Sequence, residues 1–574
     1  MNSLVLAILI IPLAASAACF LLRKAEGSIT RSIALAVSLA LLALTSKISW
    51  DYLELVSGHS QIVSKGNTFA PVEGSTVIKE LFRFQPATDT RPDAGVIRFY
   101  LGIDGLNVFI LQLTTVVFLM GVIAGWKSVK HNPGAYYGLL FFLEFSTLGA
   151  FLSFDLVFFY IFFELTIVPL FFLIGMWGGP NRQYAAKKLF MYTLAGGLMT
   201  LLGLIALVTA LGQNPGKSNT PTPVTFSIPD LVSDSMKASA LVNNMAPGDE
   251  GLSKLGTPSG HYANMQKWIF LALILGFAIK VPAVPFHTWQ PTAYFEASTP
   301  ITLIMSGILA KLGVYGFLRI VLPLVPMATM DMAWLLGWLG AIGILYGAGC
   351  AIAQDDFKKM AAYSSLSHLG FCLIGIFALN ETGITGGVLQ MINHGLITGA
   401  LLFLIAGLGD RYGTTRLKDL GGLGARLKVF AGMTMFFCMC GAGLPLLNGF
   451  VGEIMALFGM FDSRNPGYSG TCLAAASAFG MVLGAWYLLN FLMKVFFGPV
   501  EEPPFRNEEI PGDLSRMEKA ILFPLAAACL YLGCFPQPVI ETIRPEVRLI
   551  SKIANNQVVS LVKEAVAPAL PKNR

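Results

Sequence analysis

The chain has 574 residues, of which 55% are hydrophobic and only 13% are charged. A soluble domain carries roughly twice this charged fraction, and a water-soluble core does not hide so much apolar surface. The formal net charge of +6 comes from basic residues scattered over short connections, without the basic, aromatic-interleaved patch of a nucleic-acid-binding protein. Composition therefore excludes a soluble globular protein and a nucleic-acid partner, and indicates a protein of the lipid bilayer.

Apolar runs of around twenty residues recur from one end of the chain to the other. Each is long enough to cross a hydrocarbon core about 30 Å thick. Because backbone N–H and C=O groups find no partner in lipid, these runs should be helices; the strands of a barrel would be shorter and alternating. We predict an all-α polytopic membrane protein with about fourteen spans, at residues 3–22, 30–47, 104–125, 135–152, 154–176, 186–211, 267–286, 298–323, 332–353, 359–379, 385–408, 429–460, 471–497 and 517–536.

Basic residues concentrate in alternate short connections, the pattern that places those connections on the cytoplasmic side. Both termini are therefore predicted on the outer side, together with two long polar connections at 48–103 and 212–266. The sequence leaves open whether these long connections are disordered or cap neighbouring subunits. The basic residues that set the topology are Arg23, Lys24, Lys127, Lys130, Arg182, Lys187, Lys188, Lys358, Lys359, Arg411, Arg416, Lys418, Arg426 and Lys428.

The tail after residue 537 carries apolar residues at helical spacing, which predicts an amphipathic helix. This helix either lies on a membrane surface or packs against a partner protein. Its apolar positions are Val547, Ile550, Ala554, Val558 and Leu561.

Ionisable side chains fall within several predicted spans, where one charge costs on the order of 3 kcal/mol. Such residues usually face a polar interior and mark ion or proton pathways. The alternative is a structural role, in which the Lys and Glu residues form static ion pairs that hold helices together and the histidines have all their hydrogen bonds made. The candidates are Glu164, Lys280, Lys311, His287, His368, His394 and Glu453, with Glu144 as a weaker one.

These residue types suit proton transfer. Burial favours a neutral lysine and a nearby carboxylate favours a charged one, so moving Glu164 away from Lys280 would release a proton. Histidine changes charge near neutral pH and can pass protons onward. Charges near span ends are given simpler roles, snorkelling or topology for Asp155, Arg319 and Lys358, and an N-terminal cap for Asp104.

Two of the spans contain helix-breaking residues. Pro282 and Pro285 follow Lys280, and the Gly- and Pro-containing segment 441–449 precedes Glu453. Broken helices at corresponding positions of two halves are typical of ion sites in transporters built from inverted repeats. The expected parts are two helices and a loop at 1–103, a third helix at 104–134, five-helix repeats at 135–323 and 332–497, and a last helix with the tail at 498–574.

The chain shows no nucleotide-binding loop, dinucleotide fingerprint or iron–sulfur cysteine spacing. Its eight cysteines lie mostly in apolar runs, and Cys438 and Cys440 form a lone C-x-C, which is not a metal-site spacing. No metal and no redox cofactor are therefore expected on this chain.

The motifs around the buried charges follow one another between residues 100 and 500. They read LGIDGLNVF, FDLVFFYIFFELTIVPLFFLIGMWGG, FAIKVPAVPFHTW, GILAKLGVYGFLR, AAYSSLSHLGF, MINHGLITGALLF and GLPLLNGFVGE. Together they resemble the proton-translocating antiporter-like subunits of respiratory complex I, and among these the subunit M branch, called chain 4 in mitochondria. A glutamate at position 453, where a lysine would fit subunits L and N, favours that branch.

The resemblance implies fourteen helices with two inverted five-helix repeats, in which helices seven and twelve are broken. It also implies L-like and N-like membrane neighbours in a bacterial inner membrane, with NADH, FMN, iron–sulfur clusters and quinone bound on partner subunits. By motif, Glu164 corresponds to the family's glutamate of helix five, and Lys280 and Lys311 correspond to its lysines of helices seven and eight. His368 and His394 correspond to two relay histidines, and Glu453 corresponds to the exit-side acid of helix twelve.

One segment departs from the family pattern. After the break in helix seven the family usually reads H-x-W-L-P-D-A-H-x-x-A-P-T, whereas this chain reads HTWQPTAYFEAST. Gln290, Thr292, Tyr294 and Ser298 stand where the family has Leu, Asp, His and Pro. The missing acid and histidine leave open how protons reach the lysine of helix seven from the cytoplasm, and Glu296 is the nearby acid that would substitute.

Three functions fit the sequence. The preferred one is a proton-translocating membrane subunit of NADH:quinone oxidoreductase, with the redox reaction on other subunits. The second is a subunit of a multi-subunit cation/proton antiporter or of a membrane-bound hydrogenase with the same fold. The third is a structural membrane subunit whose proton path is no longer used. Similarity of fold does not by itself decide among them.

Overall fold

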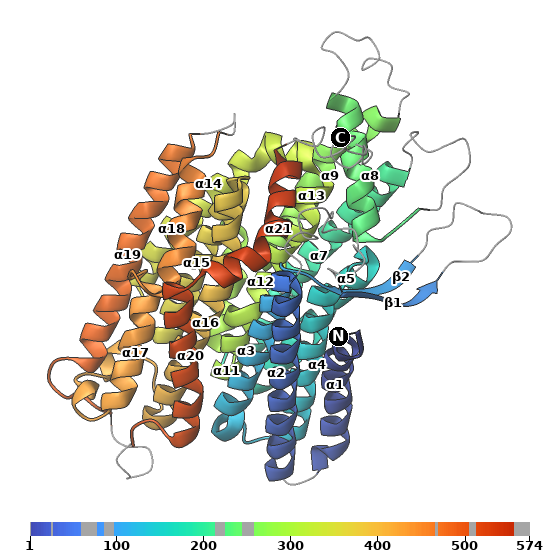
Figure 1. Ribbon diagram of the computed structural model, residues 1–574. Coiled ribbons are helices and arrows are strands. Elements are labelled where there is room, and N and C mark those ends of the chain that lie inside the picture. The colour runs from blue at the N-terminus through green and yellow to red at the C-terminus, as the bar shows by residue number, and fades with distance from the viewer. Residues whose placement is uncertain are drawn as a thin grey trace.

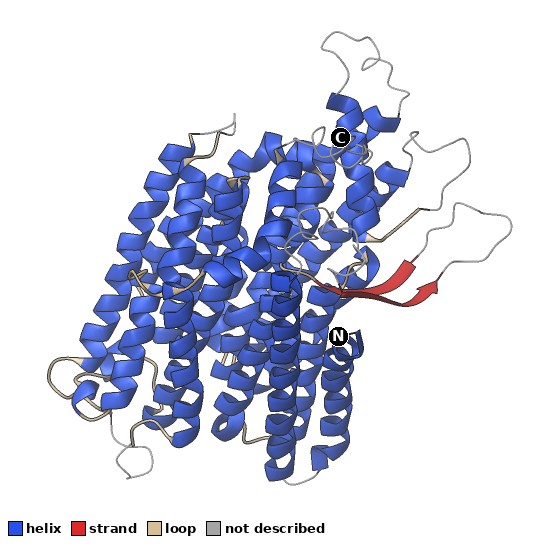
Figure 2. Ribbon diagram, viewed as in Figure 1, coloured by secondary structure: helices blue, strands red, loops and turns tan. Residues whose placement is uncertain are grey.

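The computed structural model describes residues 2–24, 27–58, 77–84, 97–212, 224–243, 258–464, 469–503 and 512–555. In this part of the chain, long helices stand side by side in one bundle, and a two-stranded hairpin projects from it (Figures 1 and 2). Twelve helical stretches are long and apolar enough to cross a membrane, and the shorter apolar helices Lys428–Gly441 and Asn448–Phe461 add one broken pass. With the helix that ends at Lys280, the described residues confirm the all-α class with fourteen spans.

The first part of the chain holds four spans and the hairpin. Its elements are α1 (Asn2–Leu21), η1 (Leu22–Lys24), α2 (Gly27–Gly58), β1 (Val77–Phe84), β2 (Ile97–Ile103), α3 (Val108–Ser128) and α4 (Pro133–Leu152). The prediction of 30–47 for the second span was too short, because α2 continues past the end of the apolar run. The antiparallel pair of β1 and β2 lies in the connection 48–103, for which no strands were predicted.

The middle of the chain contains interrupted passes. Its elements are α5 (Leu156–Leu165), α6 (Ile167–Trp177), α7 (Arg182–Gly212), α8 (Ile228–Asn243), α9 (Pro258–Lys280), η3 (Phe286–Thr288), α10 (Trp289–Glu296), α11 (Thr299–Ile304), η4 (Met305–Leu309), α12 (Ala310–Gly316), η5 (Phe317–Val321) and α13 (Leu322–Leu324). We call the pass from α11 to α13 helix eight. It is buried from Pro300 to Leu324, and η4 and η5 are π-helical turns on either side of Lys311.

The seventh span, called helix seven here, begins with α9 and is distinct from the element α7. Its break follows directly after Lys280, where α9 ends. The indole Nε1 of Trp289 donates to the Ile279 carbonyl at 2.9 Å. This bond satisfies a C=O group that the interrupted helix would otherwise leave without a partner. Lys280 therefore sits in the last turn of a half-helix, where the helix dipole favours a cation.

The last part of the chain contains the second broken pass. Its elements are α14 (Pro326–Ile352), α15 (Phe357–Phe377), α16 (Glu381–Tyr412), η6 (Leu417–Asp419), η7 (Leu423–Ala425), α17 (Lys428–Gly441), α18 (Asn448–Phe461), α19 (Gly470–Phe496), α20 (Arg516–Cys534) and α21 (Gln537–Ala554). The break between α17 and α18 is tied to α16, since the Asn393 side chain donates to the Asn448 carbonyl at 2.7 Å. A Cβ at Gly449 would come within 2.0 Å of the Cys440 carbonyl, so only glycine fits there.

The amphipathic helix of the tail is α21, and it packs on α13, α14 and α16 of its own chain (Figure 1). Val547, Ile550 and Ala554 are buried on this face. Val558 and Leu561 lie outside the described residues. Within the described part, the apolar side of the helix is thus covered by the bundle itself.

Candidate functional site

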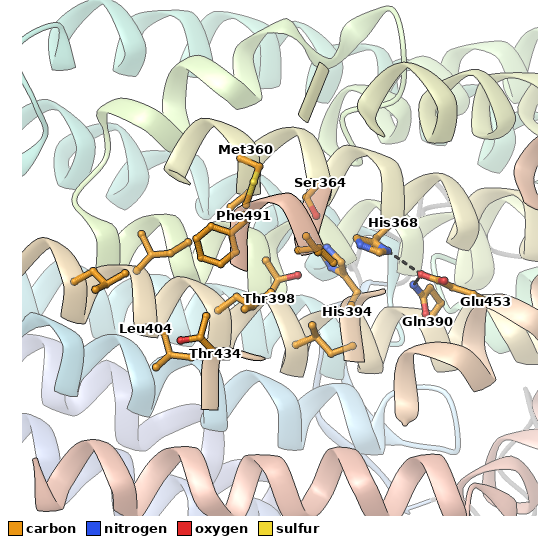
Figure 3. Close-up of a pocket in the computed structure, with 17 residues that line it drawn as sticks. Met360, Ser364, His368, Gln390, His394, Thr398, Leu404, Thr434, Glu453 and Phe491 are labelled. Carbon is orange, nitrogen blue, oxygen red and sulfur yellow. Dashed lines mark hydrogen bonds and ion pairs between the residues drawn. The ribbon is translucent and has the colours of Figure 1, made fainter. Parts of the chain in front are cut away.

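Four candidate residues form one line of side chains inside the bundle. Lys311 Nζ lies 2.6 Å from His394 Nδ1, and His368 Nδ1 lies 2.8 Å from Glu453 Oε1. The rings of His394 and His368 are 5.6 Å apart between centroids. The line passes from α12 through α16 and α15 to α18, and Figure 3 shows its histidines and Glu453. All four side chains are buried, with at most 8% of the residue exposed.

The position of Lys311 depends on the π-helical turn η4. Its Nζ donates to the carbonyl of Ser306, five residues earlier, at 2.5 Å. The hydroxyl of Ser306 lies 2.6 Å from that of Ser365 on α15. Single π turns in helices occur frequently at functional sites. An ammonium group can only donate, so its bond to His394 requires Nδ1 to be the nitrogen without a proton.

The other end of the line is held by three polar neighbours. Gln390 Nε2 donates to Glu453 Oε1 at 3.0 Å. The Tyr487 hydroxyl lies 3.3 Å from His368 Nε2 and 2.7 Å from the Ser364 hydroxyl. Both nitrogens of the His368 ring therefore have a polar neighbour, and this fixes the orientation of the ring.

Sequence reasoning missed Gln390 and Tyr487 as members of this site. Gln390 lies four residues before His394 on α16, so both side chains face the same side of the helix. That spacing was a usable signal. Tyr487 lies in an ordinary apolar run, where nothing local distinguishes it.

A small cavity of about 30 Å³ opens beside the line (Figure 3). Its polar end is formed by His368, His394, Gln390 and Glu453. The rest of its wall is mainly apolar and includes Leu404 of α16. A water needs about 10–15 Å³ of such space, so the cavity has room for about two waters next to the histidines.

Lys280 and Glu164 are neighbours that do not touch. Lys280 Nζ donates to the Phe163 carbonyl at 2.9 Å and to the Thr166 hydroxyl at 3.1 Å. Among the described side chains, none forms a hydrogen bond with Oε1 of Glu164. The Glu164 carboxylate lies against Gly197 of α7, where a Cβ would come within 2.3 Å of it. The predicted pair is therefore close together, with the lysine bound to other partners.

Two candidates lie apart from both groups. His287 is buried in η3, where its ring packs edge-on against Tyr346 at 5.0 Å and its Nδ1 has no hydrogen-bond partner in the described part of the chain. Glu144 is 1% exposed in α4, and neither of its carboxylate oxygens has a partner among the described residues. No described interaction connects either residue to the line from Lys311 to Glu453.

The segment that departs from the family pattern is held by contacts of its own. Thr292 receives a hydrogen bond from Lys188 at 3.3 Å, and the Thr288 hydroxyl lies 2.9 Å from that of Tyr192. Glu296 accepts the backbone N–H of Asn181 at 2.9 Å. This bond occupies Glu296 at the turn before α7.

The prediction that Arg319 snorkels to the membrane surface was wrong. Arg319 is 0% exposed, and its Nη1 lies 2.6 Å from Oδ2 of Asp104. Its Nε also donates to the Tyr315 hydroxyl at 2.9 Å. The reason is that the end of helix eight stays inside the bundle, so the guanidinium cannot reach water. Asp104 does accept the backbone N–H of Leu106 before α3, as a cap would, but it is also half of this ion pair.

Asp155 and Lys358 are likewise buried and bonded, so the prediction that they snorkel was wrong. Asp155 accepts the backbone N–H groups of Val157 and Phe158 and so caps α5. Lys358 donates to the carbonyls of Phe295 and Ala297. Both side chains satisfy backbone groups where helices end, and neither extends into solvent.

Known proteins are similar to this chain in sequence and in fold. The family described as NADH:quinone oxidoreductase/Mrp antiporter, TM, matches residues 153–484. NADH-quinone oxidoreductase subunit M of Rhodobacter capsulatus is 35% identical over 453 residues, which cover 79% of this chain and 81% of the relative. A chain of respiratory complex I from Thermus thermophilus matches with a TM-score of 0.73 at 25% identity, over 97% of this chain and 99% of that one. A chain of the Mrp complex from Dietzia sp. DQ12-45-1b shares the fold, with a TM-score of 0.71 at 18% identity and the same coverage.

The fold and the buried line of titratable groups thus define an antiporter-like membrane subunit. The chain belongs to the NADH:quinone oxidoreductase/Mrp antiporter family. Within that family its similarity is to subunit M, and this confirms the resemblance seen in the motifs. The matched region includes every candidate from Glu164 to Glu453 and leaves Glu144 outside.

Proposed function

We propose that this chain is a proton-translocating membrane subunit of NADH:quinone oxidoreductase, in which electron transfer on other subunits drives protons through its buried side chains. The observation that carries the proposal is the line of contacts from Lys311 through His394 and His368 to Glu453. Each of these groups binds and releases protons, and neighbours lie within reach directly or through one water.

The chemistry of the line is a sequence of proton transfers between fixed groups. The Lys311 ammonium gives a proton to Nδ1 of His394, and the proton passes to His368 through the adjoining cavity. Glu453 stabilises the positive charge that arrives on His368 and then accepts the proton. Gln390 holds the carboxylate in place for this step. Glu453 is thus the exit-side group.

In the first half of the chain, Glu164 and Lys280 are the corresponding pair. A lysine keeps its proton when a carboxylate is near and releases it when the carboxylate is distant. His287 and Glu144 are proposed as further proton carriers, supported by their burial and by their nitrogen and oxygen atoms without partners in the described chain. In this proposal the expected repeat at 135–323 contains both lysines, Lys280 and Lys311, and the path from Lys311 continues through groups of the expected repeat at 332–497.

The surroundings follow from the same function. The chain lies in a bacterial inner membrane with both termini on the outer side, as the basic connections indicate. Its neighbours are L-like and N-like membrane subunits. NADH, FMN, iron–sulfur clusters and quinone are bound on partner subunits, so this chain acts by conformation and electrostatics. The identity to subunit M, compared with the 18% identity to the Mrp chain, favours the oxidoreductase over a cation/proton antiporter.

The test replaces Lys280 by Ala in the complete complex. Inverted membrane vesicles receive NADH, and a pH-sensitive dye follows proton uptake into the vesicle. We expect proton pumping to fall at least about tenfold, because a positioned proton carrier contributes that much or more. NADH:ferricyanide activity, which depends on other subunits, should stay unchanged.

Lys267→Ala is the matched control for this experiment. Lys267 is on the same helix, but its side chain is 63% exposed and pairs with Asp331 at 3.5 Å. It should pump normally. If Lys280→Ala also pumps normally, the buried polar groups are structural and the proposal is wrong.

A further inference from the structure

We propose that Thr166 is a positioning residue that holds Lys280 away from Glu164, so that the lysine alternates between a hydroxyl and a carboxylate partner. The structure shows the lysine bound at the hydroxyl. The inference rests on the proposed function, because it assigns a role within the same proton path. Thr166 would determine on which side of its helix the lysine releases its proton.

The site of Thr166 is produced by a local interruption of the helix. Pro169 lacks the N–H group that would bond to the Leu165 carbonyl, and the pass is interrupted at Thr166, between α5 and α6. Thr166 is fully buried there. Its hydroxyl donates to the Phe163 carbonyl at 2.8 Å and accepts from Lys280 at 3.1 Å. A hydroxyl has one proton and two lone pairs, so it can make both bonds at once.

The ammonium group is bound twice at this position. The Phe163 carbonyl that accepts from Thr166 also accepts from Lys280 at 2.9 Å. The Phe163 ring lies under the same nitrogen, 4.0 Å from it to the ring centroid. The interruption thus provides two hydrogen-bond acceptors and an aromatic face for one cation.

Glu164 lies on a different side of the same helix. Residues two apart on a helix do not face one another, so the side chains of Glu164 and Thr166 point in different directions. The lysine therefore does not bind both at short distance. Oε1 of Glu164 has no hydrogen-bond partner among the described residues, although Lys280 is near enough for the charges to interact. This is the arrangement expected of a carboxylate whose partner has moved to a second position.

The Thr166 position directs the lysine towards helix eight. Lys280 and Thr166 line a cavity of about 20 Å³ together with Met305, Leu309 and Ala310. Ala310 directly precedes Lys311 in the sequence. The cavity has space for about one water. A proton released here faces the second half of the protein.

The first experiment compares Thr166→Val with Thr166→Ser in the complete complex. Valine keeps the shape of the side chain and removes the hydroxyl. The Lys280 ammonium then loses its bond to Thr166, and the balance between its two positions shifts towards Glu164. A hydrogen bond to a charged group shifts the balance between two positions by roughly tenfold or more. We expect NADH-driven pumping to fall about tenfold, and the alkaline limb of its pH profile to move up by about one pH unit. Serine should restore both.

Thr200→Val is the matched control. Thr200 is also fully buried, but its hydroxyl donates only to the Gly196 carbonyl of its own helix, at 3.1 Å. This variant should pump with the wild-type pH profile. NADH:ferricyanide activity in the membranes shows how much complex has assembled, and Thr166→Ala takes the place of the valine variant if that one does not assemble.

The outcomes separate this inference from the proposed function. If Lys280→Ala abolishes pumping while Thr166→Val pumps normally at every pH, Thr166 does not position the lysine. Failure of Thr166→Ser to rescue an assembled complex leads to the same conclusion. Normal pumping by Lys280→Ala refutes the proposed function itself. In the double variant Glu164→Gln/Thr166→Val the two effects should not add, because both residues act on one lysine, and additive effects would overturn the inference.

Discussion

Buried charges in this protein are of two kinds. Arg319 and Asp104 form a short ion pair, and they also bond to the Tyr315 hydroxyl and to backbone N–H groups. Glu164 and His394 are titratable groups outside any ion pair within the described part of the chain, and each has a buried polar atom without a hydrogen-bond partner there. A fixed ion pair holds helices together, whereas a group that passes protons has to exchange partners. The short contact between two full charges therefore marks Arg319 and Asp104 as a structural pair.

The ion pair supports a prediction about stability. Asp104→Asn leaves the Arg319 charge buried without its carboxylate, and losing one partner of a buried pair costs about 3–5 kcal/mol. We expect a lower unfolding temperature of the purified complex, or less of this subunit assembled in the membrane. Thermal unfolding followed by fluorescence measures the first, and native gel electrophoresis measures the second.

Asp331→Asn provides the comparison for Asp104→Asn. It breaks the ion pair between Asp331 and Lys267, whose side chains are 48% and 63% exposed, respectively. An exposed pair contributes at most about 1 kcal/mol, so this variant should unfold close to the wild-type temperature. If the unfolding temperature fell equally in the two variants, the burial of the Arg319–Asp104 pair would have no effect on stability.

At the scale of elements, helix breaks place the reactive groups. The breaks in helices seven and twelve were predicted from Pro282, Pro285 and the segment 441–449, because proline and glycine act locally on the backbone. The interruption at Thr166 also has a local cause in Pro169, but the prediction treated this stretch as one continuous span. The π turns around Lys311 have no comparable signature, since no residue type demands them.

The amphipathic helix α21 is fixed to the bundle by a buried acid. Glu546 is 3% exposed, and its Oε1 accepts the backbone N–H of Gly105 at 3.3 Å. Burial, and then the charge of Asp104, raise the pKa of Glu546 to about 8. The other titratable groups close to it are Arg319 and Tyr52.

The raised pKa predicts that α21 is held less firmly in alkaline solution. The docked helix binds a proton more tightly than the undocked one, so docking is strongest below the ordinary pKa of 4.5 and weakens as the pH rises to about 8. Hydrogen exchange of residues 537–554, corrected for the intrinsic effect of pH, should show falling protection across this interval. In Glu546→Gln the protection should no longer depend on pH in this way. An unchanged pH dependence in Glu546→Gln would assign the effect to another group.

At the scale of the whole molecule, helix eight joins the two halves. In chain order it ends the first expected repeat, yet its lysine contacts His394 of the second. Because Lys311 is fully buried, it has no access to lipid or solvent except through its neighbours. The first-half lysine, Lys280, faces the same helix across a cavity. The two proposed proton paths therefore meet at helix eight.

His394→Gln tests the link at this meeting point. Glutamine can still accept a hydrogen bond from Lys311 but does not bind a proton near neutral pH. Pumping by the complete complex should fall about tenfold or more while the subunit assembles normally. The same substitution at the exposed His131 is the control and should have no effect. Wild-type pumping by His394→Gln would remove the histidine from the proposed path.

The sequence predicted the class of fold and the identity of the charged residues more completely than their contacts. Apolar length and proline position are local properties, and they sufficed for fourteen spans with two breaks. The bonds between different helices along the buried line of titratable groups join residues 59 to 123 positions apart, such as Ser306 to Ser365 and Ser364 to Tyr487. No local pattern reports such distances. The burial of Arg319 was missed for the same reason, because its partner Asp104 is 215 residues away.

The π turns of helix eight have a consequence for how this segment tolerates length changes. Each residue of a regular helix turns the next side chain by about 100°. η4 lies just before Lys311, and η5 contains Arg319, so each turn sets the direction of one of these cations. Deleting a single residue inside η4 would swing Lys311 off His394, and deleting one between Gly316 and Arg319 would pull the arginine from Asp104. A surface loop tolerates the deletion of one residue. In helix eight the same deletion would break either the contact between Lys311 and His394 or the ion pair between Arg319 and Asp104.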